Sequence, residues 1–357
     1  MVNIAIITGA RPNYMKVAGI VSLLRSVERF NVSHVHTNQH YDDKLSESIL
    51  KQLKLIPDRV LDPDRSNSIS RLSSISVELS RIFSELKTEI VVIPGDIDSS
   101  LAAAISALKC NVQIVHVESG LRSFDRKMPE EQNRIIIDEL SSVLFITEFS
   151  GLRNIHPAPT QKLFYVGNTM IDSIISNNTE IERSNILIEL NLQSFDYILC
   201  TFHRPSNVDD PEKLGNIFKK LSQINKNKTI IFPIHPRTLE ILEKNPFLFE
   251  LTKEIRVVPA LNYFDFQKLL KNCFFVVTDS GGIQEEAAYY LKKCYTYRLN
   301  TERPATIFSG SNILILSDNW NEFINIYDEE IGEDLSVIDL WDGKSSYRIV
   351  EILKAIL

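Results

Sequence analysis

The sequence predicts an α/β protein with two Rossmann-like, doubly wound parallel-sheet domains that face each other across a cleft. Short apolar runs alternate with longer amphipathic stretches, which is typical of parallel strands covered by helices on both faces. The 357 residues also exceed the size at which one hydrophobic core stops growing, so two domains are expected. Finally, polar side chains gather where the apolar runs end, and ligands of such sheets bind at that edge.

The expected strands form two sets. The first set comprises residues 4–7, 32–36, 90–93, 112–115, 143–146 and 163–166. The second comprises residues 197–200, 229–232, 255–258, 274–277, 294–297 and 313–316. Residues 167–172 and the polar stretch 176–184 separate the sets, and their composition suits a hinge. We therefore expect domains at 1–168 and 169–344, with a C-terminal helix at 345–357 that packs back on the first domain.

Composition argues against several kinds of partner and location. The formal charge of −7 is spread along the chain without a basic run, so neither nucleic acid nor a membrane surface is an expected partner. No apolar stretch approaches the length of a membrane span, and the apolar run at the amino terminus lacks a preceding basic region. A cytoplasmic location is expected. The four cysteines are far apart, which indicates neither a disulfide framework nor a metal site.

The segment from Thr278 to Ala287 carries the clearest ligand signal. It follows an apolar run and reads as a strand, a turn at Ser280, Gly281 and Gly282, and the start of a helix. Unpaired amides at such a helix start can cradle a phosphate, and Glu286 could reach the hydroxyls of a ribose. These residues alone fit an ordinary strand–helix junction equally well, but other strand ends carry charged residues too.

Those residues sort by charge. The groups that are or can be cationic are Arg11, Lys16, His203, Arg204, His235 and Arg303. The acidic groups are Asp96, Glu118, Glu130 and Glu131. Together they suit an anionic ligand whose uncharged part meets carboxylates able to move protons, and a nucleoside diphosphate sugar has this shape.

Several of these residues have simpler explanations. Asp96 could instead cap a helix over 98–108. Glu130 and Glu131 follow Pro129, and the residues alone favour a role in complementing a helix amino terminus. We expect His34 and His36 to be structural, and His116 fits a core or a site equally well, so it is left out of the predicted site. The cofactor motifs Gly-x-Gly-x-x-Gly and Walker A, zinc-ligand spacing and a serine nucleophile elbow are all absent from the sequence.

The chain resembles the UDP-N-acetylglucosamine 2-epimerases, enzymes of glycosyltransferase-B-like fold, over nearly its whole length. The matching motifs are Gly9-Ala10-Arg11-Pro12-Asn13-Tyr14-Met15-Lys16, Gln39-His40-Tyr41-Asp42, Gly95-Asp96, His116-Val117-Glu118-Ser119-Gly120-Leu121-Arg122-Ser123, Met128-Pro129-Glu130-Glu131-Gln132-Asn133-Arg134, Val166-Gly167-Asn168-Thr169, His203-Arg204-Pro205, Asp279-Ser280-Gly281-Gly282-Ile283-Gln284-Glu285-Glu286-Ala287 and Asn300-Thr301-Glu302-Arg303-Pro304.

The resemblance implies interconversion of UDP-GlcNAc and UDP-ManNAc through elimination and re-addition of UDP, in bacteria for surface-polysaccharide precursors. It implies a homodimer that needs neither a cofactor nor a metal. By matching position, the catalytic residues would be Asp96, Glu118, Glu130 and His203. The UDP-sugar would be bound by Arg11, Lys16, His235, Ser280, Gly281, Gly282, Glu286 and Arg303. Further candidates are Glu131, Arg134 and Arg204.

Some positions depart from the family pattern. Asn38 stands where a glycine is usual, and Ile97-Asp98-Ser99-Ser100 and Gly19-Ile20-Val21 are variants. Gln39 and His40 match a region that in some members forms a second, regulatory UDP-GlcNAc site, and the Asn38 change weakens the case for that regulation here.

Other activities stay open at this stage. They are the hydrolysing branch that releases ManNAc and UDP, the branch acting on UDP-2,3-diacetamido sugar uronates, a UDP-sugar glycosyltransferase, and a catalytically silent nucleotide-sugar sensor.

Overall fold

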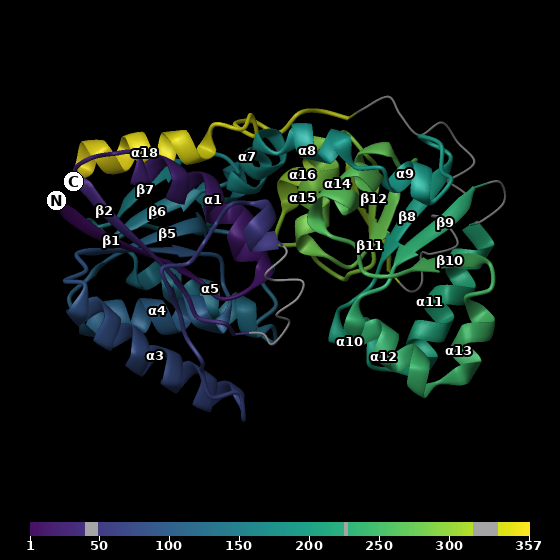
Figure 1. Cartoon of the computed structure of the whole chain (residues 1–357), viewed down its shortest axis with the longest axis horizontal. Helices are drawn as coiled ribbons and strands as arrows, with labels where there is room; N and C mark the ends of the chain where they lie inside the picture. The colour runs from purple at the N-terminus through teal and green to yellow at the C-terminus, as the bar shows by residue number, and fades with distance from the viewer. Residues whose placement is uncertain (40–48, 225–227, 317–334) are drawn as a thin grey trace. The chain divides into compact units, whose positions relative to one another are not determined.

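The computed structural model describes residues 1–39, 49–224, 228–316 and 335–357. They divide into two compact units, the first made of Met1–Asn177 with Asp339–Leu357 and the second of Asn178–Ile338 (Figure 1). Each unit has its own parallel sheet and its own hydrophobic core. The predicted fold class, two doubly wound parallel α/β sheets, is confirmed.

The sheet of the first unit has, among the described residues, seven strands in the order β3-β2-β1-β4-β5-β6-β7, all paired in parallel. The strands are β1 (Val2–Thr8), β2 (Phe30–His36), β3 (Arg59–Val60), β4 (Ile90–Pro94), β5 (Gln113–Ser119), β6 (Val143–Ile146) and β7 (Lys162–Tyr165). The helices are α1 (Arg11–Arg25), α3 (Ser68–Glu85), α4 (Asp98–Lys109), α5 (Pro129–Leu140), α6 (Phe149–Asn154), α7 (Thr169–Ser176) and α18 (Ser345–Ile356).

The sheet of the second unit has six described strands in the order β10-β9-β8-β11-β12-β13, again all parallel. They are β8 (Tyr197–Thr201), β9 (Thr229–Pro233), β10 (Ile255–Val258), β11 (Val276–Thr278), β12 (Cys294–Thr296) and β13 (Asn312–Leu314). The helices are α8 (Asn178–Arg183), α9 (Ile186–Glu189), α10 (Pro205–Val208), α11 (Pro211–Ile224), α12 (Pro236–Lys244), α13 (Pro246–Leu251), α14 (Tyr263–Asn272), α15 (Gly281–Tyr289) and α16 (Pro304–Phe308).

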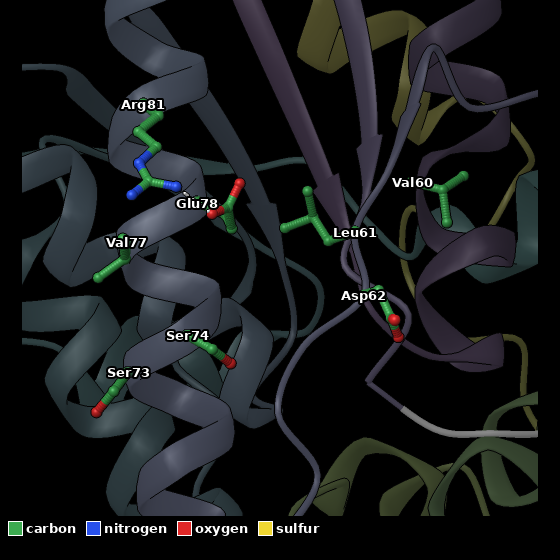
Figure 2. Close-up of a pocket in the computed structure, with 8 residues that line it drawn as sticks. All are labelled: Val60, Leu61, Asp62, Ser73, Ser74, Val77, Glu78 and Arg81. Carbon is green, nitrogen blue, oxygen red and sulfur yellow. Dashed lines mark hydrogen bonds and ion pairs between the residues drawn. The ribbon is translucent and has the colours of Figure 1, made fainter.

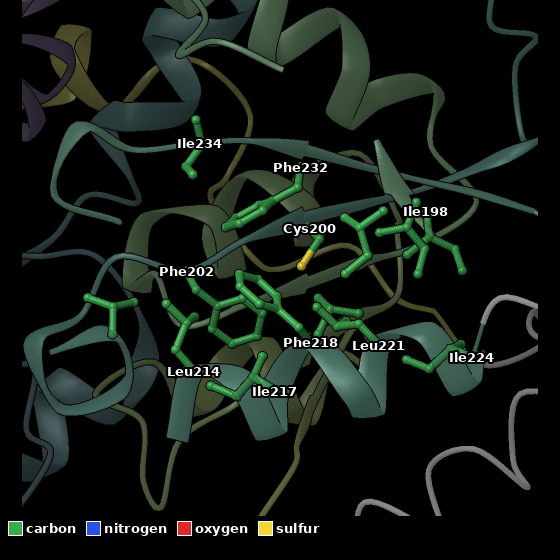
Figure 3. Close-up of a cluster of buried hydrophobic side chains, with 14 of the residues drawn as sticks. Ile198, Cys200, Phe202, Leu214, Ile217, Phe218, Leu221, Ile224, Phe232 and Ile234 are labelled. Carbon is green, nitrogen blue, oxygen red and sulfur yellow. The ribbon is translucent and has the colours of Figure 1, made fainter. Parts of the chain in front are cut away.

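The apolar runs form these strands because both faces of each sheet are covered. In the second unit the apolar face of α11 packs on the sheet, as Figure 3 shows for Phe218 and Leu221. The ring of Phe218 meets that of Phe232 in β9 edge to face, with centroids 5.8 Å apart. In the first unit four alanines of α4 are fully buried in the core, which lets this helix lie close to its neighbours.

The C-terminal segment belongs to the first unit. Helix α18 packs on α1 and α7, and the indole Nε1 of Trp341 donates to the Thr147 carbonyl at 3.0 Å. The carboxylate of Asp172 accepts from the Ser345 and Ser346 amides at the start of α18, at 3.2 and 2.5 Å. Helix α7 belongs to this unit as well, because the Ser173 hydroxyl donates to the Met15 carbonyl of α1 at 2.5 Å. The unit boundary therefore follows α7, whereas the sequence analysis placed it before this helix.

The order of the strands determines where each unit can bind a ligand. Strand order reverses between β1 and β4 in the first sheet and between β8 and β11 in the second. Helices on either side of such a point diverge, so the carboxyl ends of the two strands leave an opening for a ligand. The residues that follow these strands include Asp96 in the first unit and His203 and Ser280 in the second.

Candidate active site

Glu118 has an unusual backbone conformation for a strand residue. Its φ is +72°, in the left-handed region that non-glycine residues rarely adopt. The pairing of β5 with β6 shifts register between Val117 and Ser119, so Glu118 occupies a bulge. A bulge redirects a side chain at the end of a strand, and strained residues of this kind cluster at functional sites.

The carboxylate of Glu118 forms a buried ion pair with Lys16 of α1. Both side chains are less than a tenth exposed, so the pair is little screened by water. Gly95, with φ +64°, lies against it, and a Cβ there would come within 2.9 Å of Lys16 Nζ and 3.1 Å of Glu118 Oε2. The loop after β4 can therefore approach the pair only with a glycine at this position.

Asp96 is held from α5. Its carboxylate accepts from Arg134 Nε and NH2 at 3.1 and 2.5 Å, and Asn133 Nδ2 donates to its carbonyl at 2.9 Å. Asp96 does not cap the following helix, because the N-cap residue of α4 is Ile97. The carboxamide oxygen of Gln39 instead accepts from the amide and hydroxyl of Ser99, at 2.8 and 2.7 Å.

The two acidic residues that begin α5 have different surroundings. Glu131 is buried, contacts Arg134, and accepts from the amides of Ser123 and Phe124 at 2.8 and 3.0 Å. It therefore positions Arg134 and the loop before the helix. Glu130 is exposed and lies four residues before Arg134, on the helix face that carries the Asp96 contacts. Its catalytic role stays a prediction.

Three further predicted residues of the first unit are placed as follows. Arg11 begins α1 directly after the turn that ends β1, and it is half-buried. Gln39 is buried beside α4, where it makes the Ser99 contacts. His40, the other predicted regulatory residue, lies outside the described residues.

In the second unit Asp279 organises the loops that follow β8 and β11. Its fully buried carboxylate accepts from the amides of His203 and Arg204, at 3.2 and 2.9 Å, and from Asn207 Nδ2 at 3.0 Å. The same carboxylate lies 3.4 Å from His203 Nδ1, and Arg204 Nε donates to the Asp279 carbonyl at 2.8 Å. One acidic side chain thus positions two of the predicted cationic residues.

His235 lies beside His203, with ring centroids 5.5 Å apart. It is the N-cap residue of α12, and its Nδ1 accepts from the Arg237 amide at 3.2 Å. Because Nδ1 accepts, the ring proton is on Nε2, and this nitrogen can donate to a ligand.

The turn after β11 leads into α15 with Ser280 as N-cap residue, and no side-chain cap bond is made there. Arg303 approaches this helix start so closely that a Cβ on Gly281 would come within 2.7 Å of its NH1. Glu302 and Glu285 hold the guanidinium, the latter 3.1 Å from Arg303 Nε. The Ser280 amide donates to the Thr278 hydroxyl at 3.0 Å. A buried guanidinium at a helix amino terminus is a favourable position for a phosphate.

Glu286 projects from α15 and is buried. Burial and the neighbouring Glu285 raise the pKa of the Glu286 carboxyl to about 8. At neutral pH the group is therefore mostly protonated and can both donate and accept a hydrogen bond, as a pair of vicinal hydroxyls requires.

Two residues that hold these loops were missed as site residues, although both lie in quoted motifs. Asn13 accepts from the amides of Gly9 and Ala10, at 3.0 and 3.3 Å, and donates to the Pro94 carbonyl at 3.2 Å, which ties the loops after β1 and β4 together. Asp279 does the same for the second unit. The available signal was their position directly beside strand ends, where a buried polar side chain must find partners.

Figure 2 shows a pocket of about 570 Å³ that lies elsewhere in the first unit. It is formed by Val60, Leu61 and Asp62 together with residues of α3, including the ion-paired Glu78 and Arg81. None of the predicted site residues lines it, so it has no part in the site described above.

The described part of the chain has neither a metal-binding cluster nor a membrane-spanning helix. It contains no group of three or more His, Cys, Asp or Glu side chains arranged to hold a metal ion. None of its helices combines the length and the apolar composition that crossing a membrane requires.

Comparison with known proteins gives a consistent answer. The family model described as UDP-N-acetylglucosamine 2-epimerase matches residues 23–354. The UDP-N-acetylglucosamine 2-epimerase of Methanocaldococcus jannaschii is 35% identical, over 98% of this chain and 98% of that protein. The UDP-2,3-diacetamido-2,3-dideoxy-D-glucuronate 2-epimerase of Pseudomonas aeruginosa is 34% identical, over 87% of each chain.

A solved structure agrees with these matches. The crystal structure of Methanocaldococcus jannaschii UDP-GlcNAc 2-epimerase in complex with UDP-GlcNAc and UDP has a TM-score of 0.89 and 35% identity, covering 99% of both chains. The predicted glycosyltransferase-B-like fold and the predicted resemblance are both confirmed. This chain therefore belongs to the UDP-N-acetylglucosamine 2-epimerase family, whose members are enzymes that epimerise nucleotide sugars.

Proposed function

We propose that this protein interconverts UDP-GlcNAc and UDP-ManNAc by eliminating UDP from the sugar and adding it back. Family membership supports this proposal. The observation that carries it is the strained, buried Glu118 ion-paired with Lys16, close to the loop that carries Asp96. A carboxylate that the fold holds in a strained position at a strand end is suited to moving a proton.

The reaction proceeds in two balanced halves. In the first, a carboxylate removes the proton from C2, the electrons of the C2–H bond form a C1=C2 double bond, and the C1–O bond breaks. UDP leaves with the bonding electrons and a 2-acetamidoglucal remains. In the second half a proton is delivered to the opposite face of C2 and a phosphate oxygen of UDP bonds again to C1.

The first unit supplies the proton chemistry of this proposal. Lys16 contacts the carboxylate of Glu118, and Arg134 contacts that of Asp96. A carboxylate can accept a proton, and after accepting one it can donate it. Glu130 is proposed as the third proton-transferring group on the strength of the family resemblance.

The second unit supplies groups for UDP, whose diphosphate gains charge as the C1–O bond breaks. His203, Arg204 and Arg303 supply donors and positive charge for it, and the Ser280-Gly281-Gly282 turn supplies the amino terminus of α15 with its positive dipole end. The catalytic role proposed for His203 is to stabilise this developing charge. His235 donates from Nε2, and Glu286 is proposed to bind the ribose hydroxyls. Arg11 and Lys16 of the first unit are proposed to contact the substrate as well.

Two related reactions remain alternatives to be tested. A hydrolysing enzyme would release ManNAc and free UDP. The similarity to the Pseudomonas aeruginosa enzyme favours, as a second candidate, epimerisation of a UDP-2,3-diacetamido sugar uronate. That substrate carries an additional carboxylate and would need a further cation.

The deciding experiment is incubation of the protein with UDP-GlcNAc in heavy water, followed by proton and phosphorus NMR. The proposal predicts UDP-ManNAc, deuterium at C2 of both sugars, and no accumulation of free UDP. Accumulating UDP and ManNAc would identify the hydrolysing reaction. Absence of deuterium at C2 would refute epimerisation and would be expected of a glycosyltransferase, which has no proton to exchange there.

We also propose that the protein is a homodimer, which the family resemblance supports and sedimentation velocity would measure. The same resemblance supports a role for the product in surface-polysaccharide precursor synthesis.

A further inference from the structure

His116 has surroundings that the proposed reaction does not yet explain. It lies in β5, two residues before Glu118, and is completely buried. Its Nδ1 is 2.7 Å from the Asp138 carboxylate of α5, and its Nε2 is 3.0 Å from the Gly95 carbonyl. Both partners are acceptors, so both ring nitrogens must donate, and only the imidazolium has two N–H groups.

Asp138 is suited to pairing with a cation. Its second carboxylate oxygen lies 2.6 Å from Arg122 NH1 and accepts from the Gly120 amide at 3.2 Å. Burial would raise the pKa of the Asp138 carboxyl, but the hydrogen bond from His116 and the positive charges of His116 and Arg122 together lower it. The carboxyl is therefore ionised, and a buried carboxylate beside the ring stabilises the imidazolium.

The contacts of this pair reach residues that neighbour two of the predicted catalytic carboxylates, Glu118 and Asp96, in the chain. His116 precedes the strained Glu118 in the chain and Gly120 follows it, and Asp138 accepts a hydrogen bond from each. The carbonyl that the ring holds belongs to Gly95, whose Cα faces the Lys16–Glu118 pair and whose next residue is Asp96. Loss of the ring would remove the hydrogen bond to the Gly95 carbonyl and the partner of Asp138, which in turn accepts from the Gly120 amide.

The other two buried histidines of this sheet show what a structural histidine looks like here. His34 Nε2 and His36 Nδ1 lie 2.8 and 3.3 Å from the Thr8 hydroxyl, and His36 Nε2 lies 3.1 Å from the Tyr14 hydroxyl. His36 Nδ1 also lies 3.2 Å from the Thr8 carbonyl. Each ring thus has at least one nitrogen that faces a hydroxyl, which can donate as well as accept and can therefore serve a neutral ring. Neither nitrogen of His116 has such a partner.

We propose that His116, as a buried imidazolium paired with Asp138, is a positioning residue that holds the Gly95–Asp96 loop and the Glu118 bulge in their reactive arrangement. This inference rests on the proposed function of Asp96 and Glu118. It assigns His116 no contact with the substrate.

The first test does not depend on activity. Nitrogen-15 NMR of the intact protein with labelled histidine is expected to show, for His116, two protonated ring nitrogens at neutral pH. The resonance is assigned by its loss in His116→Gln. A neutral tautomer, with one protonated and one unprotonated nitrogen, would overturn the inference even if the enzyme is active.

The second test separates positioning from folding. His116→Gln should lower kcat for deuterium exchange at C2 about 10- to 100-fold, the range seen when partners that orient reactive groups are removed, and change KM and UDP affinity much less. His34→Gln, which removes another buried imidazole of the same sheet, is the matched control and should leave kcat within about threefold, because surroundings away from the site contribute little to the reaction. Unchanged kcat in His116→Gln, or an equal loss in the control, would overturn the inference.

Failure of the proposed role of His116 can be distinguished from failure of the proposed reaction. If the unmodified protein exchanges no deuterium at C2, the proposed reaction fails, whatever the protonation of His116. If His116→Gln does not fold, its kcat does not report on the positioning of the loops. In that case the nitrogen resonances of the unmodified protein, assigned by selective labelling of the chain, decide for or against the imidazolium.

Discussion

Replacing Glu286 with glutamine should stabilise the free protein while weakening its binding of UDP. Burial raises the pKa of this carboxyl from 4.5 to about 8 in the folded protein. The unfolded chain ionises near pH 4.5, so stability is full below that pH and is lost as pH rises through about 8. Glutamine has the same shape and no charge, so the variant should not show this loss.

The magnitude follows from the shift. At about 1.4 kcal/mol per pH unit, Glu286 should reduce the free energy of unfolding by about 3 kcal/mol between pH 5 and pH 8. Urea unfolding curves of the two proteins at both pH values give the difference directly, because all other titrating groups are shared. Glu240→Gln, an exposed change in α12, should leave the pH dependence nearly unaltered.

Binding should change in the opposite direction. A carboxyl can carry its proton on either oxygen, whereas the glutamine amide has its donor and acceptor in fixed positions and a bulkier NH2 group. Loss of one hydrogen bond to a ribose hydroxyl through this mismatch should lower UDP affinity by about tenfold, measured by calorimetry. The combination of higher stability and weaker binding is expected only if a buried, mostly neutral acid faces the nucleotide. An unchanged pH dependence of unfolding in Glu286→Gln would refute the reasoning, and so would a variant that is less stable at pH 8.

Three further changes test other parts of the structure. Gly281→Ala places a Cβ 2.7 Å from Arg303 NH1, so the guanidinium must move. Calorimetry should show UDP affinity reduced by about tenfold. Unchanged affinity would contradict the proposed phosphate site. Lys16→Met leaves the Glu118 carboxylate buried without this cation, which should lower the free energy of unfolding in urea by about 3 kcal/mol. The variant should also lose deuterium exchange at C2. Exchange at the wild-type rate would contradict a role for the Lys16–Glu118 pair in the reaction. Burial lowers the pKa of His34 from 6.5 to about 4 in the folded protein. As pH falls below about 6.5, the His34 ring therefore becomes protonated in the unfolded chain but not in the folded protein. Stability should drop by about 2 kcal/mol between pH 7 and pH 5, and His34→Gln should remove that drop. A drop of the same size in the variant would contradict a neutral His34 in the folded protein.

The strands were predictable because burial on both faces leaves a plain pattern. All twelve predicted runs coincide with strands of the two sheets. Strand β3 was missed because it is a two-residue edge strand with both residues exposed, and no apolar run marks it. The first compact unit ends one helix after the expected domain boundary. The contact between Ser173 of α7 and Met15 of α1 joins residues 158 positions apart, so the sequence carries no local signal for it.

In the candidate site, the positions of residues at strand ends were predictable, whereas the contacts between residues far apart in the chain were not. Strand ends pointed to Asp96, Glu118 and the turn at Ser280, because parallel strands bring such ends to one edge. The sequence did not indicate which carboxylate pairs with which cation. Lys16 and Glu118 are 102 residues apart, and Asp96 and Arg134 are 38 apart. His116 was left undecided because its role depends on which atoms face its two nitrogens, and only the packed structure shows them.

The most direct measurement of the central claim is deuterium exchange at C2 of UDP-GlcNAc by Glu118→Gln, set beside its affinity for UDP. If the first unit moves the proton while the second holds the nucleotide, exchange should fall by about a thousandfold and UDP should bind almost as tightly as to the unmodified protein. Exchange at the original rate would contradict the account, and a loss of UDP binding in proportion to the loss of exchange would do so as well.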